Sequence, residues 1–227
     1  MISVKLIIMT VVVTADIVGS RMLADRAQAQ RVLDDAIARA EHDLPLAVRA
    51  LRPTVGDEQQ GEYPTLDAAM GSLLLLQLTL PDGIECRFGI GIGAVSAVPS
   101  ASGDIPEGPA WWAAREAIDK VHALQQRTVP TARTWVVAAP EEGATAEREA
   151  RMANSYLLAR DQLVAAMSER TRRLTYGRCL GITQRELASS EGITQSAVSQ
   201  ALATSGASAV IEGFRLLDLE SVPPPTR

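Results

Sequence analysis

The sequence predicts an α+β protein in which a sheet domain of the split-βαβ, ferredoxin-like type precedes a helical domain. Three observations lead to this fold class. Up to about residue 140, strand-like and helix-like runs alternate in the order strand-helix-strand-strand-helix-strand-helix-strand. After residue 150, only helical periodicity is found. The chain has 227 residues, of which 47% are hydrophobic, so it is long enough for one or two domains with buried cores.

Each element of the sheet domain has its own signal in the sequence. Apolar runs rich in β-branched residues predict strands. We interpret the first of them as a buried central strand, the alternative being a signal peptide cleaved at Val13-Thr14-Ala15. Apolar residues at helical spacing, ended by Pro45 or by Pro81, predict helices. The predicted strands cover residues 6–14, 48–55, 59–63, 84–98 and 134–138. The predicted helices cover residues 25–44, 65–80 and 109–124.

The rest of the chain reads as a helical domain behind a linker. The segment PEEGATA has the composition of a linker, and a long helix, or two in line, is predicted over residues 148–174. Two short helices follow, and the tail SVPPPTR is typical of disorder. The predicted organisation is a sheet domain at 1–140, a linker at 141–150, a helical domain at 151–220 and a disordered tail at 221–227.

Composition excludes several classes of protein. Two cysteines far apart and two histidines argue against a disulfide framework, a zinc finger and a Ser-His-Asp hydrolase. Aromatic residues make up 4%, too few for a platform that stacks single-stranded nucleic acid. The net charge of −5 is uneven, because residues 1–150 carry 13 basic and 20 acidic residues while residues 151–227 carry 9 and 7. No apolar run is long enough to span a membrane, so we expect a cytoplasmic protein with no membrane partner.

Three carboxylates mark a candidate metal site. Asp16 ends the first predicted strand, and Asp57 and Glu58 lie at the tip of the predicted hairpin. In a split-βαβ sheet these two ends can be neighbours, and oxygen ligands of this kind suit Mg²⁺ or Mn²⁺. The alternative is purely structural, because aspartates are common at strand ends and in turns.

Four motifs in a fixed order carry a family resemblance. They are TADIVGSR at 14–21, GDEQQG at 56–61, RFGIGIG at 87–93 and GPAWWAAREAI at 108–118. Over about residues 9–140 the chain resembles the SatD family, and more distantly it is similar to the palm domain of class III nucleotidyl cyclases. That resemblance implies that Asp16 and Asp57 hold metal ions on a nucleotide. It also implies that the stretch Ile17, Val18, Gly19 and Ser20 wraps the phosphates and that Arg115 steadies the triphosphate charge in catalysis.

The chain departs from the cyclase pattern at two places. Trp111 stands where the cyclases carry an asparagine, four residues before Arg115, and we weigh a core or interface role for it against stacking on a nucleotide. Pro53, with Arg52 beside it, replaces the lysine of adenine-selective cyclases. These departures favour a palm that binds a nucleotide without cyclising it. Since class III cyclases build their sites between two palms, the resemblance also implies a homodimer.

A second motif lies in the helical part. Residues 183–205 resemble the helix-turn-helix of DNA-binding repressors, with Ala188, Gly192 and Val198 at the characteristic positions. Thr183 with Glu186 predicts a capping box, and Thr194 a second cap. The predicted base contacts come from Thr194, Gln195, Ser196, Ser199 and Gln200. The predicted phosphate contacts come from Arg172, Arg173, Arg178 and Arg185.

Three functional hypotheses follow. The one we prefer from the sequence is a DNA-binding, transcription-regulatory protein whose palm binds a nucleotide with Mg²⁺ or Mn²⁺. The second is an enzyme, a nucleotidyl cyclase or transferase that uses two metal ions. The third is a non-catalytic dimeric scaffold. The sequence favours a role other than catalysis, because the asparagine and the lysine of the cyclases are missing.

Overall fold

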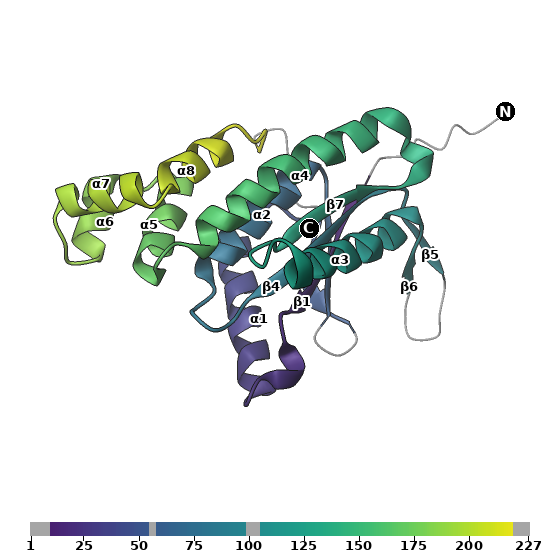
Figure 1. The fold of residues 1–227 in the computed structure, drawn as a ribbon, viewed down its shortest axis with the longest axis horizontal. Coiled ribbons are helices and arrows are strands. Elements are labelled where there is room, and N and C mark those ends of the chain that lie inside the picture. The colour runs from purple at the N-terminus through teal and green to yellow at the C-terminus, as the bar shows by residue number, and fades with distance from the viewer. Residues whose placement is uncertain (1–9, 55–57, 99–104, 220–227) are drawn as a thin grey trace.

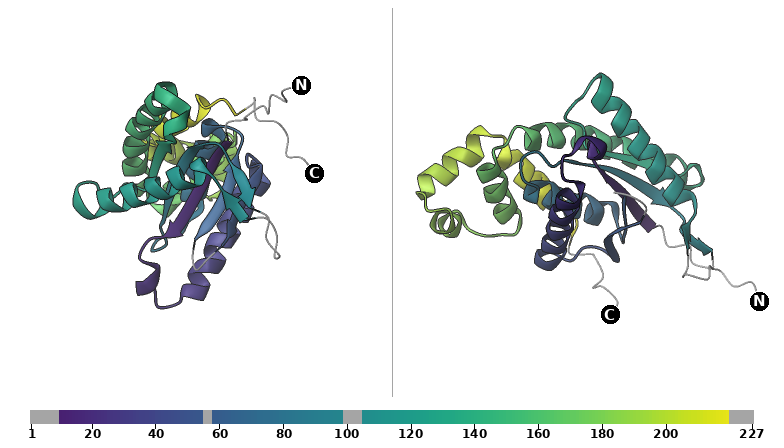
Figure 2. Two further views of the ribbon diagram at one scale, coloured as in Figure 1. Left: turned by 90° about the vertical axis from the view of Figure 1, so that its right-hand side faces the viewer. Right: turned by 90° about the horizontal axis from the view of Figure 1, so that it is seen from below.

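The computed structural model describes residues 10–54, 58–98 and 105–219, so the predicted tail at 221–227 lies outside the described residues. It confirms the mixed α+β class, with a five-stranded sheet, helices on both of its faces and a helical extension at one end (Figures 1 and 2). The strands are β1 Thr10–Ile17, β2 Arg49–Pro53, β3 Gln59–Tyr63, β4 Cys86–Gly93, β5 Ser96–Val98, β6 Ile105–Glu107 and β7 Thr134–Ala138. The α-helices are α1 Arg26–Asp43, α2 Leu66–Thr79, α3 Pro109–Arg127, α4 Gly143–Ala165, α5 Glu169–Cys179, α6 Gln184–Ser190, α7 Gln195–Thr204 and α8 Ala207–Arg215. Two 3₁₀ turns, η1 Ser20–Met22 and η2 Pro140–Glu142, complete the described elements.

Strand β1 lies at the centre of the sheet, as predicted. The strand order is β2-β3-β1-β4-β7, and every neighbouring pair is antiparallel except β4 with β7. Val12 and Val13 in its middle are fully buried, because helices cover both faces of this strand. The β-branched run is therefore a core strand, and its predicted first residues, 6–9, lie outside the described part of the chain.

The alternating glycines of β4 allow helix α3 to lie directly against the sheet. A Cβ atom at Gly91 would come within 2.0 Å of the carbonyl oxygen of Ala110, and one at Gly89 within 2.2 Å of that of Ala114. Both contacts are far shorter than van der Waals distance, so any larger residue would push the helix away. The glycine stripe therefore serves close helix packing, which is its structural explanation.

Helix α2 joins the sheet to the C-terminal helices. Leu73 and Leu76 pack into the core under the sheet, whereas Leu74, Leu75 and Leu78 belong to a second core with α5, α7 and α8. A helix that is apolar all round is buried on all sides, and α2 meets this description. The helical part thus shares α2 with the sheet part. No helix within the described residues is long and apolar enough to cross a membrane.

Helix α4 covers the open edge of the sheet along β7. The side chain of Asn154 accepts a hydrogen bond from the backbone N–H of Val136 at 2.8 Å and donates one to its carbonyl at 2.9 Å, as a neighbouring strand would. Two turns later, Asp161 accepts hydrogen bonds from the backbone N–H groups of Arg133 at 2.7 Å and Thr134 at 2.8 Å. These contacts satisfy backbone groups that an edge strand otherwise leaves unpaired.

The structure differs from the predicted organisation at several points. Residues 141–150, predicted as a linker, end η2 and begin α4. Residues 148–174, predicted as one long helix or two in line, belong to two helices, since Ser168 caps α5 by accepting from the N–H of Thr171. The predicted strand over 84–98 is divided into β4 and β5, and α8 was not predicted. Gly206, with φ of 74°, precedes α8, whose Val210, Ile211 and Phe214 are buried.

Candidate functional site

The register of the sheet places the two described carboxylates of the predicted site at one end of neighbouring strands. Ala15 of β1 lies opposite Gln59 of β3, so Asp16 and Glu58 are the next residues on each strand. Side chains of directly opposed residues point to the same face of a sheet. Both carboxylates are therefore on the face covered by α3. Asp57, the third predicted ligand, lies outside the described residues.

Asp16 is held by an arginine that sequence reasoning did not single out. Arg87 lies opposite it on β4. The Nε and Nη2 groups of Arg87 donate to Oδ1 and Oδ2 of Asp16 at 2.8 and 2.9 Å. This is the bidentate geometry of strong carboxylate–guanidinium pairs. The available signal was that Arg87 is the one charged residue in the glycine-rich motif RFGIGIG, at the end next to the candidate site.

Glu58 is paired as well. Its Oε2 accepts a hydrogen bond from Nη2 of Arg115 on α3, and its Oε1 accepts one from Gln60 at 3.0 Å. The fold thus brings Arg115 to the carboxylate edge, as the resemblance implied. Its side chain is 54% exposed, so its guanidinium is accessible from outside.

The predicted metal site stays a prediction, because Asp57, one of its three carboxylates, lies outside the described residues. Each oxygen of Asp16 and Glu58 already accepts a hydrogen bond from a guanidinium or an amide. Over residues 10–54, 58–98 and 105–219 there is no group of three Asp, Glu, His or Cys side chains that could hold a metal ion. Among the described residues, Arg87 pairs with Asp16 and Arg115 pairs with Glu58 at this edge.

The tryptophan pair at the start of α3 divides between core and surface. Trp111 is buried against Val12, Ala110 and Ala114, and the guanidinium of Arg49 lies 5.9 Å from its ring centre. Trp112 is 63% exposed. Trp111 therefore has the core role that the sequence offered as one of its two interpretations.

A cavity of about 730 Å³ adjoins Asp16 and Arg87. The predicted phosphate-binding stretch forms one wall, since Ile17, Val18, Gly19 and Ser20 all line it. Gly19 has φ of 65°, a left-handed conformation that residues with a side chain rarely adopt, and a Cβ there would meet no atom within 4 Å. The N–H of Val18 donates to the carbonyl of Glu85 at 2.8 Å, which fixes the stretch to the start of β4.

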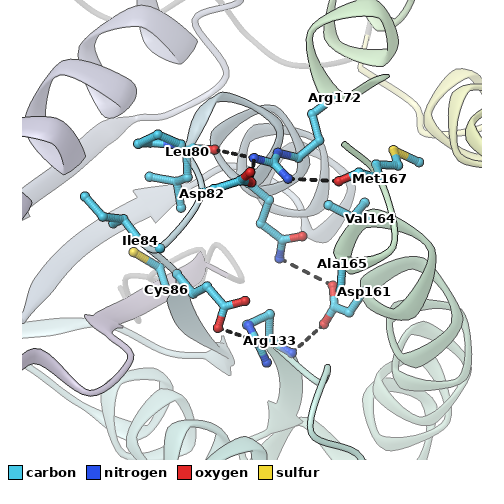
Figure 3. A pocket seen from close by; sticks show the side chains of 14 residues that line it. Leu80, Asp82, Ile84, Cys86, Arg133, Asp161, Val164, Ala165, Met167 and Arg172 are labelled. Carbon is cyan, nitrogen blue, oxygen red and sulfur yellow. Dashed lines mark hydrogen bonds and ion pairs between the residues drawn. The ribbon is translucent and has the colours of Figure 1, made fainter. Parts of the chain in front are cut away.

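A second, smaller cavity of about 170 Å³ lies between the sheet and the helical part (Figure 3). Arg172 closes one side of it by donating to the carbonyls of Leu80 and Met167 and to Asp82. Asp161 and Arg133 lie on the other side, and Arg133 also lines the larger cavity. Arg133 and its ion-pair partner Glu85 thus line both cavities.

Comparison with known proteins identifies the family. The SatD family model matches residues 10–212. This chain belongs to the SatD family. The match includes the sheet and most of the C-terminal helices, so it extends beyond the 9–140 from which the resemblance was recognised. No curated protein matches this SatD family member.

Solved structures similar to this SatD protein include nucleotidyl cyclases. A bacterial light-regulated adenylyl cyclase is 14% identical, with a TM-score of 0.43 over 57% of this chain and 75% of the other. Adenylate cyclase from Trypanosoma brucei is 15% identical, with a TM-score of 0.40 over 48% and 67%. The adenylyl cyclase CyaB from P. aeruginosa is 12% identical, with a TM-score of 0.38 over 52% and 81%. At these identities the similarity concerns the fold alone.

The prediction of a DNA-binding regulator is wrong. The similar structures are nucleotidyl cyclases, and neither they nor the family description points to DNA binding. The two short helices and the left-handed turn at Gly192 do form, and Thr183 and Glu186 make the predicted capping box. The residues expected to contact bases are exposed on or next to α7, a helix without Lys or Arg; they are Thr194, Gln195, Ser196, Ser199 and Gln200.

The arginines predicted to bind DNA phosphates serve the protein itself. Arg173 forms a bidentate pair with Glu191 at 2.8 Å for both contacts. Arg172 is bound to Asp82, and Arg178 donates to the carbonyl of Ile182 at 2.6 Å. Of the four, Arg185 on α6 is the one for which no such contact is described. Few of these arginine side chains remain to contact a DNA phosphate backbone. This is the physical reason why the helix-turn-helix motif led to a wrong prediction.

Proposed function

We propose that this protein binds a nucleoside triphosphate at the end of β1 and is an enzyme of the nucleotidyl cyclase or transferase type. One observation carries the proposal. Three separate parts of the chain, namely Asp16 with the adjoining stretch Ile17–Ser20, Glu58, and Arg115, all border the same edge of the sheet. The cyclase resemblance implied a role for Asp16, for Ile17–Ser20 and for Arg115, and Glu58 follows Asp57, the other residue to which the resemblance gave a role.

The arginines supply the chemistry in this proposal. Arg87 and Arg115 lie at the end of β1, where they can offset the charge of a triphosphate and the charge that develops on a leaving pyrophosphate. Asp16 and Glu58 orient these guanidinium groups. Asp16 and Glu58 are the described residues that would hold a Mg²⁺ or Mn²⁺ ion, and the proposal assigns no step to that ion.

Binding without turnover is the second candidate. Two observations favour it: Arg87 engages both oxygens of Asp16, and Trp111 is buried in the core where the cyclases carry an asparagine. In this case the same edge binds the nucleotide, and the nucleotide-bound protein carries the function without forming a reaction product.

The experiment measures binding and turnover on the same samples. The full chain is mixed with ATP, GTP, CTP or UTP in Mg²⁺, Mn²⁺ or EDTA, and its melting temperature and pyrophosphate release are recorded. A ligand at a hundred times its Kd stabilises a protein by about 2.7 kcal/mol, which is readily detected. Arg87→Gln should abolish the response. Arg127→Gln, an exposed arginine at the end of α3, should leave it unchanged.

The outcomes separate the candidates. Pyrophosphate release together with a cyclic or transferred nucleotide product supports the enzyme. A melting shift without product supports binding alone. No shift with any nucleotide overturns both.

We also propose a homodimer through the surface around Trp112, whose exposed ring is unusual for a tryptophan. Light scattering of the wild type and of Trp112→Ala tests it, with a monomeric wild type as the contrary result.

A further inference from the structure

The far wall of the larger cavity is built by a part of the chain to which the proposed function gives no role. Facing the stretch Ile17–Ser20 are the last two turns of α3 and the segment that leads into β7. The side chains that line this wall are His122, Gln125, Gln126, Pro130 and Arg133. His122, Gln125 and Gln126 are three and four residues apart, which places them on one face of the helix.

Arg133 is fixed in this wall. Its Nη1 donates to the carbonyls of Pro130 at 2.7 Å and Ala132 at 2.9 Å, and its Nη2 pairs with Glu85 at 2.6 Å. The arginine side chain is 13% exposed, whereas that of Glu85 is 51% exposed. The carboxylate therefore lies at the rim and the guanidinium deeper in. Asp161 holds the backbone N–H of Arg133 from the other side.

Gln125 connects Arg133's segment to Arg87. Its Oε1 accepts from Nη1 of Arg87 at 3.4 Å, and its Nε2 donates to the carbonyl of Ala132 at 2.7 Å. The cavity thus has two guanidinium groups whose positions are set before any ligand arrives. Preorganised donors of this kind lose little entropy when a ligand binds.

Both guanidinium groups keep hydrogen-bond donors for a ligand. A guanidinium has five N–H groups. In the described part of the chain Arg87 makes three hydrogen bonds, and so does Arg133. The amide nitrogen of Gln126 and Nε2 of His122 form a hydrogen bond with each other at 2.5 Å. The remaining guanidinium N–H groups and Nδ1 of His122 suit a ligand that brings several acceptor oxygens and negative charge. A chain of phosphates has both properties, and guanidinium matches phosphate geometry.

We infer that this wall is the pyrophosphate subsite, in which Arg133 and His122 together with Arg87 bind the terminal phosphates of the nucleotide. The inference rests on the proposed function and adds Arg133 and His122 as binding residues. The cavity of about 730 Å³ is within the usual range for small-molecule sites, so it can take a polyphosphate with part of its nucleoside.

The test uses inorganic pyrophosphate as the probe and two neighbouring positions on α3. His122 lines the cavity, whereas Ala123 lines a separate groove with Leu124, Arg127 and Trp135. Isothermal titration of the full chain in EDTA should show pyrophosphate binding by the wild type. His122→Glu should weaken it by at least about tenfold, because a carboxylate in the cavity repels phosphate. Ala123→Glu, with the same added charge, should change the Kd by less than about twofold.

A second variant keeps the inference testable if His122→Glu fails to fold. Arg133→Gln should also weaken pyrophosphate binding by about tenfold, the loss expected for a charge-assisted contact. The inference is overturned if the wild type does not bind pyrophosphate, or if His122→Glu and Ala123→Glu behave alike. Its failure is distinguishable from that of the proposed function. A chain that binds ATP equally well with and without Arg133 refutes the subsite alone, and a chain that binds pyrophosphate but no nucleotide refutes the proposed function alone.

Discussion

Two carboxylate–arginine pairs lie near the same end of the sheet, on either side of Arg133, and they differ in burial. Asp161 and Arg160 have side chains with no exposed surface. Asp16 is 25% exposed and Arg87 11% exposed, beside the larger cavity. Asp161 accepts from two backbone N–H groups, from Gln77 and from Arg160. Asp16 accepts from Arg87.

The difference shows which pair is structural and which can take part in binding. Arg160 is further bound to Thr134 at 2.6 Å, so the buried pair is part of a network that docks α4 on β7. Breaking it leaves a charge without water or partner. The pair at the cavity faces solvent, so a ligand can replace one partner at small cost. Both arginines make two hydrogen bonds to their carboxylate, at 2.8 and 2.9 Å for Arg87 and at 3.1 and 2.8 Å for Arg160, and burial distinguishes the pairs.

The largest expected effect comes from removing the charge of the buried pair. Asp161→Asn keeps the size of the side chain but leaves Arg160 as an uncompensated buried cation. We expect a loss of about 3–5 kcal/mol in the free energy of unfolding. Urea denaturation of the full chain measures it. Glu169→Gln is the matched control, since Glu169 accepts from the N–H of Asp82 at the same interface but on its exposed side. It should cost less than about 1 kcal/mol, and a similar small loss for Asp161→Asn would contradict the assignment.

At the cavity, removing the carboxylate should change binding more than stability. Asp16→Asn should cost about 1 kcal/mol or less in the free energy of unfolding, because the pair is in contact with solvent. In EDTA it should tighten pyrophosphate or ATP binding by about three- to tenfold, because Asp16 repels phosphate and competes for Arg87. Titration calorimetry decides the point. If Asp16→Asn instead binds the phosphate ligand more weakly than the wild type in Mg²⁺, and no binding is seen in EDTA, Asp16 acts by holding a metal ion.

The contrast between the two pairs also explains what the sequence could predict. β3 and β7 were predicted at their observed bounds and α2 within a residue at each end, because local patterns of apolar residues set them. Asp16 and Arg115 were chosen from motifs, and the fold places both at the carboxylate edge. The partners of these residues depend on the register of β1 with β4, which no local pattern reveals. Arg87 was missed for that reason, and Arg133 because its place depends on the pairing of β4 with β7.

The same limit applies to the helical part. Composition alone suggested a linker at 141–150. In the structure α4 packs along the edge strand β7, where Asn154 and Asp161 bind backbone groups that would otherwise be unpaired. The role of these two residues follows only once β7 is known to be the edge strand. The pattern of residues 183–205 correctly predicted two capped helices and a glycine turn. It did not predict function. The charge of Arg173 was expected to bind DNA phosphate but is paired with Glu191, and a contact between residues far apart in the sequence is not visible in a local pattern.

A third carboxylate, Glu41, sharpens the comparison because no described residue forms an ion pair with it. Burial raises the pKa of Glu41, while hydrogen bonds from Ala47 and Ser72 act in the opposite direction. An acid with a raised pKa binds its proton more tightly in the folded state than in the unfolded chain. The stability it contributes is therefore present at low pH and is lost as the pH rises from about 4.5 through the folded pKa.

Glu41→Gln, which cannot ionise, should remove this loss. We expect the variant to gain stability relative to the wild type between pH 4 and pH 8, by up to about 1 kcal/mol, the smallest of the effects considered. Urea denaturation at both pH values measures the difference. A difference that does not change with pH would mean that Glu41 titrates alike in the folded and unfolded chain. Burial would then have little effect on the ionisation of Glu41, and this result would weaken the argument that burial distinguishes Asp161 from Asp16.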